Sequence, residues 1–155
     1  YVLNHFLEGF RTTVFRQTLF AEFERKAHEL EQSGTPLTAD CLNGIYAELE
    51  KTYYSAAKMQ DVVAVEWSYI PHFYRAFYVY QYATGFSAAV AIASYILETG
   101  DTAGYLRFLT TGGSDYPLNE LRIAGIDLTS PAVVENAMQV FAETIDELAA
   151  VLVKE

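Results

Sequence analysis

The stretch PHFYRAFYVYQYATG, residues 71–85, decides the fold because it places one histidine, two phenylalanines and four tyrosines within fifteen residues. Few solvent-facing surfaces hold rings at this density, so the segment is predicted to be buried on most sides or to line a cleft. Pro71 suits the first turn of a helix and disfavours helical geometry at Ile70. We therefore expect one helix from Pro71 almost to Gly100, roughly 28 residues or about 42 Å long.

Three of the four tyrosines in residues 71–85 are expected to share one face, with Tyr80 on a neighbouring face beside Phe73 and Phe77. Tyr74, Tyr78 and Tyr82 recur every four residues, which is the spacing of neighbours on a helix surface. A buried phenol needs a hydrogen-bond partner, so a row of them indicates a polar surface more than plain core. The second half of the helix is rich in alanine and predicts close packing against a neighbour.

Helix signals recur along the rest of the chain. Thr38, Asp101 and Ser130 are each placed to cap a helix, and Ser33-Gly34 ends the first one. No segment has the alternation of a strand. The sequence therefore predicts an all-α, multi-helix bundle with one long central aromatic helix. The expected helices cover residues 2–32, 38–54, 71–99, 103–111, 118–125 and 132–154.

Composition bounds the function. A chain of 155 residues fits one domain. The net charge of −10 opposes binding to nucleic acid, which needs a basic face. Residues 76–97 are uncharged over the length of a membrane span, but polar side chains are spread through them, so a buried helix is expected instead. The single Cys41 favours a reduced, cytoplasmic setting. Residues 1–10 carry no secretory signal and are typical of a helix cut from a longer protein.

No complete active site is visible in the chain. His28-Glu29 begins like the zinc motif HExxH, but the fifth residue is Gln32, so His28 is expected to be solvated. None of the three histidines has a glutamate three residues before it, as a di-metal helical site needs. Motifs for nucleophilic or nucleotide chemistry are also missing. The chain is therefore expected to hold no metal ligand of its own.

Two segments outside the aromatic helix each allow two interpretations. The loop LTTGGSDYP, residues 109–117, contains paired glycines that permit positive φ, so it either cradles the main chain of a ligand or tightly connects two helices. In RTTVFRQTLFAEFE, residues 11–24, charged side chains interrupt large apolar ones. Each charged group, Glu24 included, is either solvated or paired inside, and the solvated interpretation is favoured for any one alone.

Three blocks of the sequence together resemble a known family. They are FRTTVFRQTLFAEFE (10–24), EWSYIPHFYRAFYVYQYATGFSAA (66–89) and LTTGGSDYP (109–117). In this order and spacing they are similar to the C-terminal part of the oligoendopeptidase F family, zinc peptidases of the thimet oligopeptidase type. The resemblance implies a long helical peptidase with a deep substrate channel. It also implies that the HExxH helix and a glutamate, the third zinc ligand, lie upstream of this sequence.

The resemblance assigns roles to particular residues. It implies that His72 and Tyr80, and also Tyr78, contact substrate and stabilise the tetrahedral intermediate. It leaves Tyr74 and Tyr82 as packing residues. The expected peptide-backbone contacts come from Gly112, Gly113 and Ser114. The residues expected to form a buried network behind the zinc-ligand helices are Arg11, Arg16, Gln17 and Glu22.

These inferences define a first hypothesis. Residues 1–155 would be the C-terminal helical segment of the catalytic domain of a cytoplasmic zinc oligoendopeptidase that hydrolyses short peptides. Its partners would be those peptides and the N-terminal, zinc-bearing part of the same protein, and the isolated segment would be inactive and would self-associate. The alternative is a non-enzymatic all-α module that binds a peptide or a partner helix. A coding sequence without HExxH upstream would favour the alternative.

Overall fold

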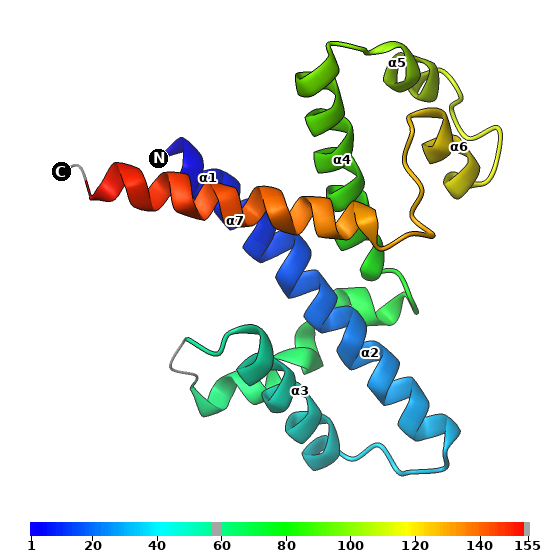
Figure 1. Cartoon of the computed structure of the whole chain (residues 1–155). Helices are drawn as coiled ribbons and strands as arrows, with labels where there is room; N and C mark the ends of the chain where they lie inside the picture. Colours follow the sequence, from blue (N-terminus) through cyan, green and yellow to red (C-terminus); the bar gives the residue numbers. More distant parts are fainter. Residues whose placement is uncertain (57–59, 154–155) are drawn as a thin grey trace. The chain divides into compact units, whose positions relative to one another are not determined.

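The computed structural model describes residues 1–56 and 60–153, and within them every regular element is helical (Figure 1). The predicted all-α class is confirmed. The chain divides into two compact units, Arg11–Ala83 and a second one formed by Tyr1–Phe10 with Thr84–Glu155. Across the described residues, no helix combines the length and the apolar composition needed to cross a bilayer.

The unit Arg11–Ala83 is built on α2 (Arg16–Gln32) and α3 (Ala39–Tyr53), which lie side by side (Figure 1). The 3-10 helix η2 (Asp61–Tyr69) packs on α3, and the Trp67 indole donates a hydrogen bond of 2.8 Å to the Asn43 side chain. The core of this unit is aromatic and aliphatic. Its buried members are Leu19, Phe20, Phe23, Tyr46, Leu49, Ile70 and Val79.

The predicted ends of the first two helices are confirmed. Helical structure runs from α1 (Val2–Gly9) through a π-helical segment, η1 (Phe10–Phe15), into α2. It ends at Gly34, whose φ of +81° allows the chain to leave the helix. The Thr38 hydroxyl then accepts a hydrogen bond of 3.2 Å from the Cys41 amide and caps α3.

In the second unit α1 packs on α7 (Ala132–Leu152), and the Phe10 ring lies 5.2 Å from that of Phe141 and 4.9 Å from that of Phe86. The predicted extension of α7 to Lys154 lies outside the described residues. The two short helices α5 (Ala103–Leu109) and α6 (Pro117–Ile123) also pack together. Gly104 is needed for this approach, because a Cβ there would stand 3.0 Å from the Ile123 carbonyl oxygen.

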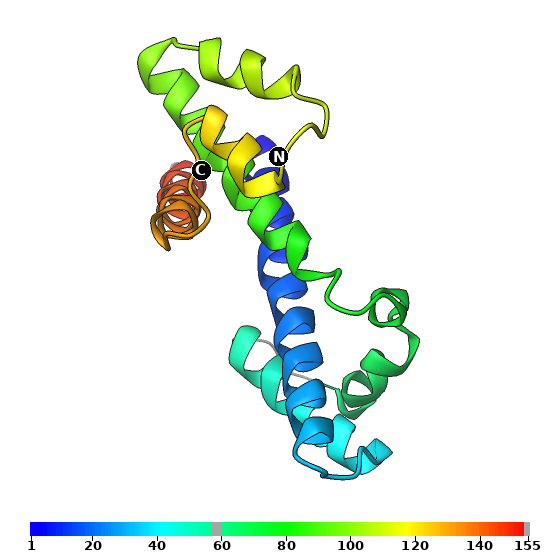
Figure 2. The same cartoon turned by 90° about the vertical axis from the view of Figure 1, so that its right-hand side faces the viewer.

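The predicted single helix from Pro71 is wrong. The structure has a 3-10 turn, η3 (Pro71–Tyr74), then an irregular stretch, and the long helix α4 begins only at Tyr80 and ends at Thr99. Figure 2 shows the chain turning between η3 and α4. The irregular stretch begins with the extended residue Arg75 and contains Phe77, whose φ is +57° although it is not glycine. No local proline or glycine signals this break, which is why periodicity alone did not predict it.

Candidate functional site

His72 of η3 and the tyrosines around the start of α4 form an aromatic cluster. The rings of His72 and Tyr78 are almost parallel, with centroids 6.0 Å apart and an interplanar angle of 8°. Tyr82 stands edge-on to both, 5.4 Å from His72 and 5.6 Å from Tyr78. The Tyr82 hydroxyl donates to the Tyr78 oxygen over 3.4 Å, and this bond raises the pKa of Tyr82. Of the three residues predicted to contact substrate, His72, Tyr78 and Tyr80, the first two therefore lie with their rings stacked.

The His72 side chain carries an unsatisfied polar atom. Its Nδ1 is buried and has no hydrogen-bond partner among the described residues. A buried ring nitrogen without a partner is costly, and such atoms are uncommon in folded proteins unless a ligand or a functional group completes them. The His72 Nδ1 is therefore placed to form a hydrogen bond with a group that the described residues do not supply.

The neighbouring tyrosines differ in exposure. Tyr80, the first residue of α4, is 50% exposed, and Tyr78 is half-buried, so neither phenol lies in a sealed interior. Tyr74, the last residue of η3, is 84% exposed, so its expected packing role is wrong within the described residues. Tyr82 packs against His72 and Tyr78, within the cluster.

The glycine loop belongs to the second unit. Gly112 and Gly113 have φ of +67° and +136°, so the expected positive-φ backbone is confirmed. The Thr111 carbonyl accepts from the amides of Gly113, at 3.0 Å, and Ser114, at 3.3 Å, which closes a tight and exposed turn. The role of Gly112, Gly113 and Ser114 along a peptide backbone stays a prediction.

Arg16 belongs to a polar cluster that joins three elements. Its guanidinium on α2 donates to the Glu66 carboxylate on η2, and the second oxygen of that carboxylate accepts from the Tyr46 hydroxyl on α3. Burial and the bond to Glu66 raise the pKa of Tyr46. Burial and the negative charge of Glu66 also raise the pKa of the nearby Glu50 carboxyl. Glu66 was not among the predicted site residues.

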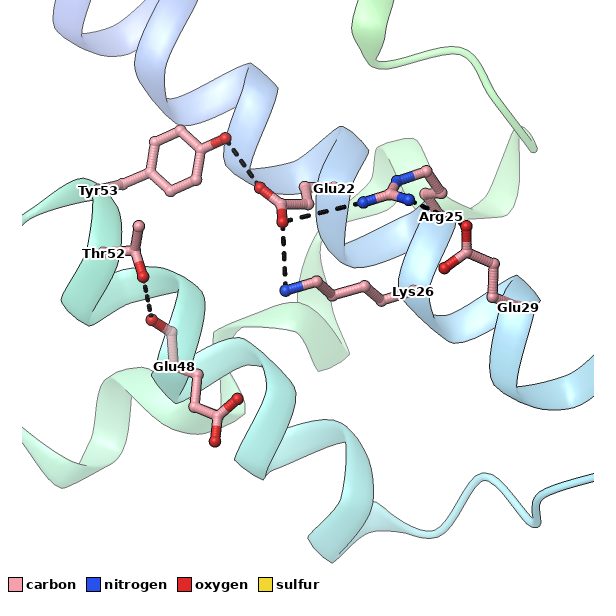
Figure 3. A network of polar contacts seen from close by, with 7 residues as sticks. All are labelled: Glu22, Arg25, Lys26, Glu29, Glu48, Thr52 and Tyr53. Atoms are coloured by element: carbon pink, nitrogen blue, oxygen red, sulfur yellow. Dashed lines mark hydrogen bonds and ion pairs between the residues drawn. The ribbon is translucent and has the colours of Figure 1, made fainter.

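Glu22 has a separate set of partners (Figure 3). Its carboxylate accepts from the Tyr53 hydroxyl at 3.0 Å and pairs with Lys26 at 3.2 Å. Burial alone would raise the pKa of Glu22, but hydrogen bonds from Lys26 and Tyr53 outweigh it and lower the pKa. Burial and Glu22 raise the pKa of Tyr53 to about 12.

The other two residues of the expected network, Gln17 and Arg11, also differ in their surroundings. The Gln17 amide donates to the Thr12 carbonyl at 3.1 Å, whereas Arg11 is exposed. Arg16 and Glu22 thus stabilise different helix contacts, and the role of these four residues behind a zinc site stays a prediction.

The structure reveals two residues of α2 whose surroundings the sequence did not indicate. Glu24 is only 6% exposed, and its carboxylate accepts a hydrogen bond of 2.8 Å from the Phe77 amide. His28 is half-buried, with its ring centroid 4.6 Å from that of Phe77. The expectation that both side chains are solvated is wrong. The available signal was their four-residue spacing, which places them on one helix face.

The described residues do not form a metal centre. Nowhere in residues 1–56 and 60–153 do three or more histidine, cysteine or acidic side chains converge as metal ligands. The donor sets that hold zinc in proteins need three or four such groups, so the described residues do not fit a zinc ion by themselves.

Comparisons with known proteins agree in their assignment. The chain is 50% identical to oligopeptidase PepF of Bacillus subtilis over 99% of its own length and 23% of the relative. It is 47% identical to group B oligopeptidase PepB of Streptococcus agalactiae, over 95% of this chain and 25% of that one. The chain therefore spans about a quarter of the length of these curated relatives.

A crystal structure of oligoendopeptidase-F from Enterococcus faecium matches all of this chain with 30% of its own length, at a TM-score of 0.96 and 46% identity. The model of peptidase family M3 matches residues 1–140. An alignment that covers almost the whole chain, together with the same fold at high identity, establishes the relationship: the chain belongs to peptidase family M3.

Proposed function

We propose that this chain is the C-terminal segment of the catalytic domain of a zinc-dependent oligoendopeptidase that hydrolyses short peptides. The observation that carries the proposal is the cluster at the start of α4. It combines a buried, unpartnered Nδ1 on His72 with a tyrosine hydroxyl at Tyr78 and an accessible one at Tyr80. The names of the relatives, oligopeptidase and oligoendopeptidase, supply the substrate class.

In this proposal the cluster binds the scissile region of the peptide. A peptide carbonyl under attack develops negative charge on its oxygen, and donors that already point at that oxygen stabilise the transition state. The Tyr80 hydroxyl is a hydrogen-bond donor of this kind. Tyr78 supplies a second hydroxyl, and His72 contacts the substrate through its ring nitrogens.

The proposal divides the active site between two parts of the protein. The residues that hold zinc and activate the attacking water lie outside this chain, in the part that precedes it. Arg11, Arg16, Gln17 and Glu22 would support the helices that carry those ligands, and Gly112, Gly113 and Ser114 would lie along the peptide backbone. This segment is then inactive by itself, and it self-associates where it lacks the rest of the catalytic domain. We also propose that the protein acts in the cytoplasm.

The test is Tyr80→Phe in the full-length protein. We expect kcat to fall by about 10²–10³, the typical cost of losing one oxyanion donor, while KM and the zinc content stay within about twofold. Tyr74→Phe is the matched control, because Tyr74 is far more exposed and lies outside the cluster. Parallel loss of zinc and turnover in Tyr80→Phe would make this residue structural.

Treatment with a chelator distinguishes the proposed zinc peptidase from the alternative, a non-enzymatic binding module. Peptide hydrolysis by the full-length protein should stop on chelation and return with zinc, and the isolated segment should show no hydrolysis in either state. A full-length protein that binds peptides equally well with or without chelator, and never cleaves them, would favour the non-enzymatic module.

A further inference from the structure

The backbone at Phe77 is the strained point of the unit Arg11–Ala83. Phe77 has φ of +57°, and among the described residues it is the one non-glycine residue with positive φ. A bulky side chain in this left-handed region is sterically disfavoured, and it persists only where surrounding contacts impose it. Contacts from neighbouring residues therefore hold Phe77 in this conformation.

Two side chains of α2 contact Phe77 from one helix face. The Glu24 carboxylate accepts a hydrogen bond of 2.8 Å from the Phe77 amide, and the His28 ring lies 4.6 Å from the Phe77 ring. Residues four apart on a helix project from the same side. Glu24 therefore holds the backbone of Phe77 while His28, on the same face, holds its ring. We name these two residues the Phe77 clamp.

The hydrogen bond between Glu24 and the Phe77 amide lies in a mostly apolar, buried setting. Glu24 helps line a cavity of about 260 Å³ whose other walls include Phe23, Trp67, Ile70 and Phe73. A carboxylate in such an apolar setting is costly unless it accepts hydrogen bonds, and an apolar side chain would be the simpler filling. The Phe77 amide donates one such hydrogen bond to the buried Glu24 carboxylate.

The left-handed residue Phe77 lies in the irregular stretch that brings His72 and Tyr78 together. In a continuous α-helix, residues six apart are turned from each other by about 120°, so their rings could not stack. In the structure the two rings are almost parallel, with centroids 6.0 Å apart. The turn at Phe77 immediately precedes Tyr78, and the fully buried Val79 then fixes the start of α4 before Tyr80.

We propose that Glu24 and His28 are positioning residues that hold the left-handed backbone of Phe77 and thereby set Tyr78 against His72, and Tyr80 at the start of α4, for peptide hydrolysis. The catalytic part of this inference rests on the proposed function. Glu24 acts through the Phe77 amide, and His28 acts through packing on the Phe77 ring. Neither residue needs to touch substrate.

The first experiment compares Glu24→Met with Glu24→Gln in the full-length protein. Glu24→Met removes the acceptor, and we expect kcat to fall by about 10²-fold, the usual scale for a small misplacement of catalytic groups, with KM and zinc content within about twofold. Glu24→Gln keeps an oxygen acceptor and should restore most of kcat. Glu31→Met, on the exposed side of the same helix, is the control and should leave kcat within about twofold.

The second experiment relieves the strain itself. Phe77→Gly and Phe77→Ala both remove the ring, but only glycine adopts the left-handed conformation without cost. We expect Phe77→Gly to retain at least about fivefold more kcat than Phe77→Ala. Adding Glu24→Met to Phe77→Gly should lower kcat by less than about fivefold, against the 10²-fold expected in the wild-type background, because the turn no longer needs the clamp.

A readout other than turnover separates this proposal from the proposed function. Thermal unfolding midpoints are measured for the wild type, Glu24→Met, Phe77→Gly and the double variant. Glu24→Met should lower the midpoint more in the wild-type background than in the Phe77→Gly background. If the effects of Glu24→Met and Phe77→Gly on the midpoint are coupled, but Tyr80→Phe leaves kcat unchanged, the Phe77 clamp is supported and the catalytic role of Tyr80 is rejected. Independent effects of Glu24→Met and Phe77→Gly on both kcat and the midpoint would overturn the clamp.

Discussion

The guanidinium of Arg16 and the carboxylate of Glu66, fifty residues apart in sequence, are joined by a hydrogen-bonded ion pair that ties α2 to η2. Their side chains are 32% and 13% exposed, so the pair is only partly screened by water. Because Glu66 also accepts from Tyr46, this pair holds together the three elements on whose core residues 70–79 pack.

Arg16→Met should therefore destabilise the protein by about 1–3 kcal/mol, because the largely buried Glu66 carboxylate would lose its positively charged partner. Arg25→Met is the control. It removes a largely exposed pair with Glu29 and a longer contact of 4.0 Å with Glu22, and should cost less than about 0.5 kcal/mol. Denaturant unfolding of the full-length protein measures both, and equal costs would contradict the importance of the Arg16 pair.

Glu50→Gln should change how stability depends on pH. Burial and the charge of Glu66 raise the pKa of Glu50 above the ordinary 4.5, so the folded state holds this proton more tightly than the unfolded state does. Stability of the wild type then falls as pH rises from 4.5 through the folded pKa. Glutamine removes that loss, so the thermal midpoint of Glu50→Gln should exceed that of the wild type at about pH 7 and approach it at about pH 4.5.

The exposed Glu48 on the same helix provides the control for this change. Glu48→Gln should shift the midpoint by a similar small amount across the whole pH range. A Glu50→Gln protein that matches the wild type at about pH 4.5 and becomes less stable than it as the pH rises would show that the charged form of Glu50 is the stabilising one.

Tyr78→Phe and Tyr82→Phe should differ in their effect on turnover, although the two hydroxyls are only 3.4 Å apart. If Tyr78 contacts the reacting carbonyl, losing its hydroxyl should lower kcat by about tenfold or more. Tyr82 donates to Tyr78 over a long bond, so its loss should cost less than about threefold. Steady-state kinetics of both variants decide this, and a larger loss in Tyr82→Phe would exchange the two roles.

The glycine loop predicts a contrast between its two glycines. Gly112, at φ +67°, is in the left-handed region that asparagine also adopts, whereas Gly113, at φ +136°, is in a region almost limited to glycine. A Cβ at either position meets no atom within 4 Å, so backbone strain alone is being tested. Gly113→Ala should cost about 1–3 kcal/mol, and Gly112→Asn less than about 0.5 kcal/mol.

The same two variants test the proposed peptide contact of the loop. Gly113→Ala should raise KM for peptides in the full-length protein with little change in kcat, and Gly112→Asn should leave both near the wild-type values. An unchanged KM in a destabilised Gly113→Ala protein would limit the loop to a structural connection between α5 and α6.

The sequence by itself determined the helical class, the caps at Gly34 and Thr38 and the positive φ of the glycine loop. These features are local, because a cap or a turn is formed by residues within a few positions of each other. The three sequence blocks that carry the resemblance also indicated the family, and the comparisons confirmed it. Of the candidate site, the sequence named His72, Tyr78 and Tyr80, and their contact with substrate stays a prediction.

Only the tertiary structure decided where α4 begins and how the cluster is held. The acceptor for the Phe77 amide comes from Glu24, 53 residues earlier, and the partner of Arg16 comes from Glu66, fifty residues later. No periodicity within the segment 71–99 contains those contacts. The rings of residues 71–85 specified an aromatic surface, but the turn that aligns them is set by a distant helix, because a strained backbone is stabilised by whatever packs against it.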